Sequence, residues 1–269
     1  MRKAVNLFPE DSYTTPENNR RGLRDRVFCN TRFYFFFSVF WTFILTGICA
    51  KRGKLNADRQ IHYSNRNIKL VERCGGKISV SGLNNIAKVE SAAAVFLGNH
   101  MSLLETAVFH SILRPRCDFT FVIKESLLKV PFFGNIMRSL KAIPVSRSNP
   151  KEDFKQVLKL GKESLNSGCS IILFPQSTRT LEFSPENFNS IGIKLAKSAG
   201  VQVIPFALKT DFIGNGKLVR DMGPINRDNQ VCFAFGEPFY IEGNGKEEQQ
   251  RVIDFIQNHI AIWNDAKRS

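Results

Sequence analysis

Paired cysteines are missing from this sequence. Its six cysteines stand singly, at positions 29, 49, 74, 117, 169 and 232, and no two of them form a Cys-x-x-Cys pair. That spacing matches neither a zinc site nor the disulfide framework of a small secreted domain. We therefore expect reduced thiols in a cytoplasmic environment. The length of 269 residues allows one sizeable hydrophobic core, or one domain plus an appendage.

The common phosphate-binding motifs are missing as well. The tetrapeptide "GNGK" occurs at 214–217 and again at 243–246, but neither copy is followed by the Ser or Thr of a phosphate-binding loop. No Gly-x-Gly-x-x-Gly fingerprint of a dinucleotide site is present either. We interpret both copies of the tetrapeptide as turns.

Acidic residues are scarce relative to basic ones. The chain has 24 Asp and Glu against 38 Lys and Arg, which gives a formal net charge of +14. Residues 1–75 alone hold 14 basic and 6 acidic side chains. Such an excess favours an anionic partner, which leaves nucleic acid, acidic lipid or a phosphorylated substrate to be distinguished.

An apolar run distinguishes among these partners. Residues 33–50, "FYFFFSVFWTFILTGICA", contain no charge, and at about 1.5 Å per residue a helix of this length falls slightly short of the roughly 20 residues that span a bilayer. A buried core helix would not need so many aromatic residues, and a signal peptide would start earlier and end in a small-residue cleavage site. We predict membrane association at the cytoplasmic face, spanning or re-entrant, and no nucleic-acid binding. The flanking cations are Arg20, Arg21, Arg24, Arg26, Arg32, Lys51, Arg52 and Lys54.

The rest of the chain alternates between strand-like and helix-like segments. Residues 58–74 predict an amphipathic helix, and residues 1–19 lack periodicity and predict a loose arm. We expect an α/β fold with a largely parallel or mixed sheet flanked by helices, divided into a basic arm and membrane-anchoring helix (1–56) and an α/β domain (57–269). The predicted strands are 93–97, 119–123, 142–145, 169–174, 201–208 and 231–235, and the predicted helices are 103–113, 150–167, 186–198 and 247–263.

His100 is one of only four histidines, and it follows the first of these strands. Active sites of α/β sheets gather beyond the carboxyl ends of the strands. Residues five apart on one helix lie about 140° from each other, so His100 and Glu105 can meet only if His100 sits on the turn before the helix. Glu105 would then hold one ring nitrogen and leave the other to take a proton, unless His100 is simply a satisfied core residue. Ser102 is nearby but is no convincing nucleophile, so the substrate would supply the hydroxyl that attacks an activated acyl carbonyl.

Four sequence blocks resemble those of the glycerolipid acyltransferases, the 1-acyl-glycerol-3-phosphate acyltransferase family. "NHMSLLE" at 99–105 is similar to the family signature of Asn-His, four residues and Asp, and "FPQSTR" at 174–179 is similar to its Phe-Pro-Glu-Gly-Thr-Arg block. "AIPVSR" at 142–147 and "VIPFAL" at 203–208 resemble two further blocks. The four blocks occur in the family's order across residues 78–240.

This resemblance implies acyl transfer from coenzyme A or acyl carrier protein to a lysophospholipid hydroxyl. It assigns His100 as general base and Glu105 as its orienting carboxylate, and it implies neither a metal nor a bound cofactor. Arg147 and Arg179 would contact anionic groups, which their donor forks suit. Further substrate-binding candidates are Lys124, Gln176, Ser177 and Thr178. Nothing in the sequence indicates an oligomeric state.

The sequence departs from the family pattern at three positions, and the changes at Gln176 and Ser177 leave the acceptor open. Glu105 replaces the usual Asp, Gln176 replaces Glu, and Ser177 replaces Gly. The alternatives are acyl transfer to a different amphiphile, such as a lyso-ornithine lipid, or a catalytically silent relative that only binds lipid.

Overall fold

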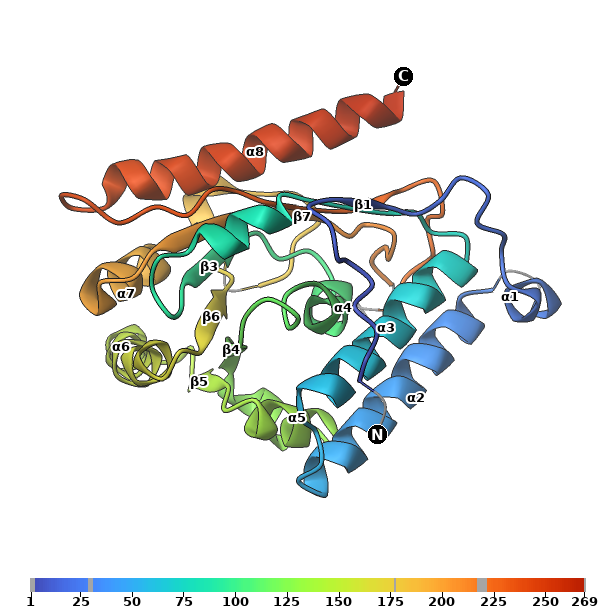
Figure 1. Ribbon diagram of the computed structural model, residues 1–269, viewed down its shortest axis with the longest axis horizontal. Helices are drawn as coiled ribbons and strands as arrows, with labels where there is room; N and C mark the ends of the chain where they lie inside the picture. Colours follow the sequence, from blue (N-terminus) through green and yellow to red (C-terminus); the bar gives the residue numbers. More distant parts are fainter. Residues whose placement is uncertain (1–2, 29–30, 177, 217–221, 269) are drawn as a thin grey trace.

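The computed structural model describes residues 3–28, 31–176, 178–216 and 222–268, and these form a sheet enclosed between two layers of helices (Figure 1). Within the described residues the sheet has eight strands in the order β1-β2-β8-β7-β3-β6-β4-β5. The five strands β7, β3, β6, β4 and β5 are parallel, β8 runs antiparallel to β7, β2 is parallel to β8, and β1 is antiparallel to β2. The predicted α/β class with a mixed sheet flanked by helices is confirmed.

The element bounds agree with most of the predicted segments. The strands are β1 (Tyr13–Thr14), β2 (Ile78–Ser81), β3 (Val95–Gly98), β4 (Phe119–Lys124), β5 (Ile143–Val145), β6 (Ser170–Leu173), β7 (Val203–Lys209) and β8 (Val231–Phe235). The helices are α1 (Leu23–Val27), α2 (Arg32–Lys51), α3 (Ala57–Arg73), α4 (Leu104–Ile112), α5 (Phe133–Ser139), α6 (Pro150–Asn166), α7 (Ile191–Ala199) and α8 (Lys246–Arg268). The sequence patterns did not predict β1, β2, α1 or α5.

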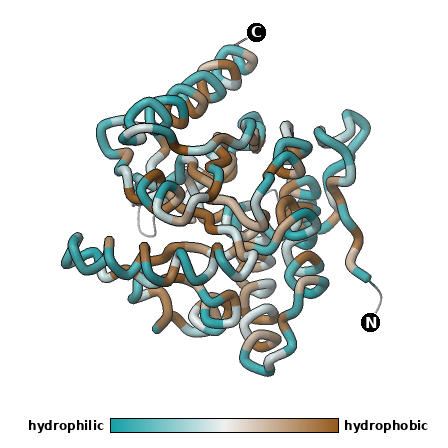
Figure 2. The backbone as a smooth tube through the Cα atoms, turned by 60° about the vertical axis from the view of Figure 1, so that its left-hand side comes forward, coloured by the Kyte–Doolittle hydropathy of each residue, from teal (hydrophilic) through white to brown (hydrophobic). Residues whose placement is uncertain are grey.

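Alternation along the strands supplies two hydrophobic cores, one on each face of the sheet. In β3, Phe96 points to the core shared with α2, α3, α4 and α5, while Val95 and Leu97 point to the core under α6, α7 and α8. Because side chains alternate between the two faces of a strand, a strand covered on both faces is apolar throughout, as β3 is. Figure 2 shows hydrophobic residues concentrated inside and hydrophilic ones on the outer surfaces of the helices.

The predicted apolar segment forms α2, which packs beside α3 and α5 (Figure 1). One side of the helix buries Phe35, Phe36 and Val39 in the core. On the opposite side Phe37 and Phe40 are 69% and 62% exposed. By length and composition α2 could cross a membrane, yet part of its surface belongs to the protein core.

The prediction of a loose arm over residues 1–19 is wrong for the residues described there. Phe8 is fully buried, and the Arg116 guanidinium donates hydrogen bonds to the carbonyls of Phe8 and Glu10. The Tyr13 hydroxyl donates to Glu72 of α3, and β1 pairs with β2. The segment lacks periodicity because it is anchored by isolated contacts and a two-residue strand rather than by a regular element.

Candidate active site

The predicted site residues gather at one edge of the sheet because the strands that carry them are parallel. Lys124 ends β4, Arg147 follows β5, Gln176 and Arg179 follow β6, and His100 follows β3. The carboxyl ends of parallel neighbours lie at the same edge, so residues far apart in the sequence meet there. Ser177 lies outside the described residues, and Thr178 is exposed in the loop after β6.

His100 and Glu105 are in direct contact. Nδ1 of His100 lies 3.1 Å from Oε1 of Glu105, with His100 on the turn before α4 and Glu105 in the first turn of that helix. Two backbone amides, those of Met101 and Ser102, also donate to Oε1, at 2.6 and 2.7 Å. Because the carboxylate accepts from the turn itself, the chain bends sharply and brings the imidazole back toward Glu105.

The carboxylate is held in its ionised form. Complete burial acts to raise the pKa of Glu105, but the hydrogen bond and charge interaction with His100 and the two amide donors outweigh that effect, and the pKa lies below its ordinary value. An ionised Glu105 accepts the proton on Nδ1 and so leaves the lone pair of the neutral ring on Nε2. The His100 side chain is 18% exposed, and none of the described residues makes a hydrogen bond to Nε2. The ring can therefore take a proton from a substrate.

The loop after β6 supports the imidazole from another direction. The Phe174 ring stacks on the His100 ring, with centroids 4.0 Å apart. The buried Gln176 accepts from the backbone amide of His100 at 3.2 Å and donates to the Thr180 hydroxyl at 3.1 Å, and the amide of Thr180 donates to the carbonyl of His100. Both ends of the Gln176 amide are thus occupied by the protein. A Glu at this position would lack the donor that reaches Thr180.

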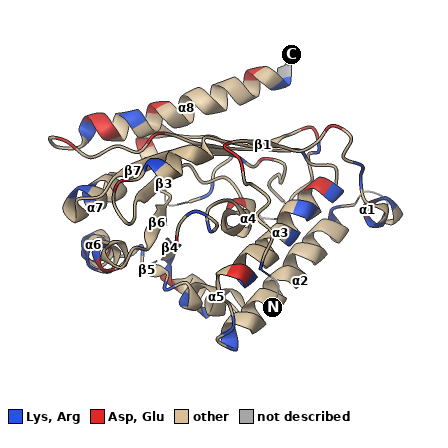
Figure 3. Ribbon diagram, in the orientation of Figure 1, with Lys and Arg blue, Asp and Glu red and all other residues tan. Residues whose placement is uncertain are grey.

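Arg147 adopts a strained backbone conformation next to a second arginine. Its φ is 64°, and the carboxylate of Asp153, on α6, accepts hydrogen bonds from the amides of Ser146 and Arg147 at 2.7 Å each. Partial desolvation and the nearby Arg179 guanidinium lower the pKa of Arg147. Two like charges held close together favour an anion between them. Elsewhere in the molecule, Figure 3 shows basic residues on α1 and at the lower end of α2.

Sequence reasoning missed several residues that shape the site. Thr210 and Asn99 connect the loop after β3 to β7, and Asp153 holds the Arg147 turn. Asn99 exchanges two hydrogen bonds with the backbone of Leu208, at 2.8 and 2.9 Å. Asn99 stands in the first sequence block and Asp153 follows an Asn-Pro helix start, but no local signal identifies Thr210. Only the pairing of β3 with β7 brings Thr210 near Glu105.

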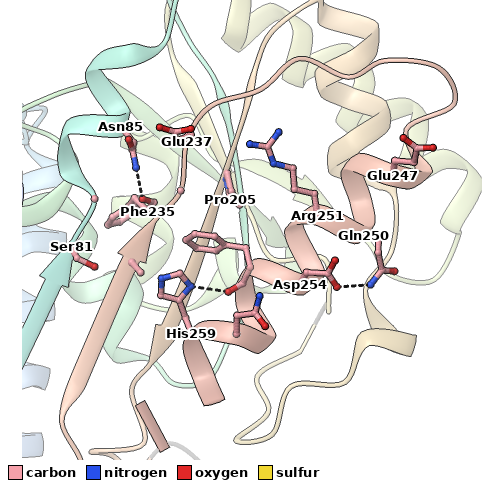
Figure 4. Close-up of a pocket in the computed structure, with 15 residues that line it drawn as sticks. Ser81, Asn85, Pro205, Phe235, Glu237, Glu247, Gln250, Arg251, Asp254 and His259 are labelled. Atoms are coloured by element: carbon pink, nitrogen blue, oxygen red, sulfur yellow. Dashed lines mark hydrogen bonds between the residues drawn. The ribbon is translucent and has the colours of Figure 1, made fainter. Parts of the chain in front are cut away.

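A sizeable cavity among the described residues lies elsewhere. Its volume is about 790 Å³, and it lies between α8 and the carboxyl ends of β2 and β8 (Figure 4). Because β8 runs antiparallel to β7, this end of β8 is at the edge opposite to His100. The cavity contains neither His100 nor Glu105, and its Arg251 is already placed over the Phe239 ring. His100 and Glu105 instead lie beyond the carboxyl end of β3.

Comparison with known proteins agrees with this geometry. The family model described as Acyltransferase matches residues 77–209. A 1-acyl-sn-glycerol-3-phosphate acyltransferase of Pseudomonas aeruginosa is 37% identical over 189 residues, which is 70% of this chain and 68% of that protein. The chain belongs to the acyltransferase family.

Other acyltransferases support the assignment and the fold. A chloroplastic 1-acyl-sn-glycerol-3-phosphate acyltransferase of Arabidopsis thaliana is 29% identical over 143 residues, covering 53% of this chain and 38% of its own length. The crystal structure of the 1-acyl-sn-glycerophosphate acyltransferase PlsC from Thermotoga maritima superposes with a TM-score of 0.63 at 21% identity, covering 90% of this chain and 97% of that one. All the predicted site residues lie within the part that matches the acyltransferase model, and Thr210 lies one residue beyond it.

Proposed function

We propose that this acyltransferase moves a fatty acyl group from an acyl thioester, acyl-CoA or acyl carrier protein, to the free hydroxyl of a lysophospholipid, with His100 as general base. The observation that carries the proposal is the contact between His100 and a fully buried, ionised Glu105, beside a basic edge of the sheet. Two relatives named for 1-acyl-sn-glycerol-3-phosphate support a phosphorylated acceptor.

The chemistry uses the two ring nitrogens differently. Nε2 of His100 removes the proton of the acceptor hydroxyl while the hydroxyl oxygen attacks the thioester carbonyl carbon. The buried charge of Glu105 stabilises the imidazolium that forms. When the tetrahedral intermediate collapses, the carbon–sulfur bond breaks, and the imidazolium returns its proton to the thiolate. An ester and a free thiol are the products, and the enzyme is unchanged.

Basic residues supply the acceptor's binding site in this proposal. Arg147 and Arg179 lie near enough for their charges to interact, and a phosphate between them would relieve the repulsion. Lys124, at the end of β4, pairs with Val145 of β5 two residues before Arg147. We assign Thr178 and Ser177 to the same acceptor site by their position in the block.

The exposed side of α2 supports membrane association in this proposal. Phe33, Phe37 and Phe40 form a contiguous apolar strip, and basic residues at both ends suit an anionic leaflet. The opposite side of the helix is packed in the protein core, which favours a helix lying in one leaflet over one surrounded by lipid. We place the enzyme at the cytoplasmic face, because its charged thioester donors do not cross a bilayer.

The test is acyl transfer by purified enzyme with a panel of lysolipids and labelled acyl-CoA or acyl carrier thioester, with products identified by mass spectrometry. His100→Ala removes the base, and we expect kcat to fall by about a hundredfold to ten-thousandfold. The matched control is His62→Ala, an exposed histidine on α3, which keeps parental activity.

Each outcome of this panel has a defined meaning. Full activity in His100→Ala would overturn the assignment of the base. Product from a lyso-ornithine lipid but not from 1-acyl-glycerol-3-phosphate would overturn the phosphorylated acceptor, and no transfer to any acceptor would identify a silent relative.

A further inference from the structure

Glu105 has a second carboxylate oxygen that the catalytic contact does not use. While Oε1 accepts from His100 and two amides, Oε2 lies 2.9 Å from the hydroxyl oxygen of Ser102 and accepts from the hydroxyl of Thr210 at 3.0 Å. Thr210 is fully buried and comes from the loop directly after β7. A residue 105 positions away in the sequence therefore contacts the carboxylate of the proposed dyad.

The hydrogen-bond pattern directs the Thr210 proton to Glu105. A threonine hydroxyl has one hydrogen to donate and two lone pairs to accept with. The Ser102 hydroxyl lies 2.9 Å from the Thr210 oxygen and can donate to it, and Ser102 in turn accepts from the amide of Leu104. The Thr210 hydrogen then has Oε2 of Glu105 as its acceptor.

The extra methylene of Glu105 gives such a contact a function. A glutamate has one more rotatable bond than the aspartate usual at this position, so its carboxylate can turn away from the imidazole more easily. Holding Oε2 as well as Oε1 fixes both the position and the tilt of the carboxylate.

The position of Thr210 is itself fixed relative to the turn between β3 and α4. Its amide donates to Sδ of Met101 at 3.1 Å. Two residues earlier on β7, the backbone of Leu208 exchanges two hydrogen bonds with the Asn99 side chain, directly before His100. The hydroxyl of Thr210 is therefore placed by the same strand pairing that places His100.

We propose that Thr210 is a positioning residue that, with Ser102, holds the longer Glu105 side chain in the orientation His100 requires, so that glutamate works in place of aspartate. The inference rests on the proposed function of His100 and Glu105. It predicts that the Thr210 hydroxyl contributes to the chemical step rather than to substrate binding or to folding.

The experiment compares Thr210→Val, which removes the hydroxyl at nearly constant shape, with Thr210→Ser, which keeps it. In acyl transfer from acyl-CoA to 1-acyl-glycerol-3-phosphate, we expect Thr210→Val to lower kcat per folded molecule by about tenfold to a hundredfold, the range of a charge-assisted hydrogen bond. KM for both substrates stays at the parental value, and Thr210→Ser restores most of kcat.

Thr120→Val is the matched control. Thr120 is also fully buried and follows the first residue of β4, but its hydroxyl has no hydrogen-bond partner among the described residues. The same substitution there leaves kcat unchanged. Equal kcat in Thr210→Val and Thr120→Val would overturn the inference, as would a Thr210→Val loss seen only in KM or in the folded fraction.

A double-mutant cycle tests the link to the glutamate. Glu105→Asp withdraws the carboxylate by one methylene and breaks contact with Thr210, so it lowers kcat less in a Thr210→Val background than in the parent. Strictly additive effects would contradict the proposal. His100→Ala in the same assay separates failure of the proposed function from failure of the role of Thr210. If His100→Ala stays active, the proposed base is wrong. If His100→Ala is inactive but Thr210→Val is unaffected, only the role of Thr210 is refuted.

Discussion

Acid should destabilise this protein through a histidine outside the active site. His110 lies on α4 with 8% of its surface exposed, its ring stacked on Phe119 at a centroid distance of 4.8 Å. Burial, with a smaller effect from the positive charge of Arg114, lowers the pKa of His110 from 6.5 to about 3. Nδ1 has no hydrogen-bond partner among the described residues. The folded protein therefore keeps this ring neutral over a pH range in which the unfolded chain protonates it.

The magnitude follows from the two pKa values. Between pH 6.5 and about 3 the unfolded state binds one proton more than the folded state, so stability falls as the pH falls. Each pH unit below 6.5 removes about 1.4 kcal/mol, so His110 alone lowers the free energy of unfolding by about 2 kcal/mol at pH 5. Above pH 6.5 its contribution is constant.

The assay is denaturant unfolding at pH 7 and pH 5 in one detergent, with the parent and His110→Phe compared. The phenyl ring keeps the stacking on Phe119 and cannot be protonated, so we expect the variant to lose about 2 kcal/mol less than the parent between the two pH values. His62→Gln, which removes an exposed imidazole, keeps the parental loss. An equal loss in the parent and in His110→Phe would refute the assignment of this acid sensitivity to a buried neutral ring.

Two further predictions concern the basic edge and the apolar strip. Asp153→Ala removes the acceptor of the Ser146 and Arg147 amides, so the left-handed turn at Arg147 relaxes. In steady-state kinetics we expect KM for a phosphorylated acceptor to rise about tenfold, with kcat less affected. Replacing Phe37 and Phe40 together by Ser removes apolar surface that faces away from the core. We therefore expect the variant to co-sediment less with anionic vesicles, while its thermal unfolding midpoint stays the same. Undiminished vesicle binding would count against the apolar strip of α2 as the membrane contact.

Periodicity identified the elements that pack as long regular units. The predicted bounds of β8, residues 231–235, are those observed, and the predicted amphipathic helix at 58–74 is α3, which buries Ile68 and Val71 on one side. Short elements without a clear apolar pattern were not predicted. The seven-residue α5 follows Phe132, whose φ is 63°, and the strand β2 alternates serine with only two apolar residues.

The site was predictable to the extent that it is local in sequence. The five-residue spacing of His100 and Glu105 required a turn followed by a helix, and this is what the structure has. Thr210 and Asp153 reach the site through strand order and helix packing, which leave no local pattern. The environment of Gln176 could not be predicted either, because nothing in its sequence block indicates that both ends of its side-chain amide bind the protein itself.

The double use of α2 determines how this enzyme can be handled. A shortened chain without residues 1–56 would lose Phe35, Phe36 and Val39 together with the apolar strip, so the faces of α3 and α5 that α2 covers would open to water. Removing residues 1–56 is therefore not a suitable way to prepare the protein without detergent. Polar replacements confined to the exposed aromatic positions would remove the apolar strip and leave the residues that α2 buries in the core unchanged.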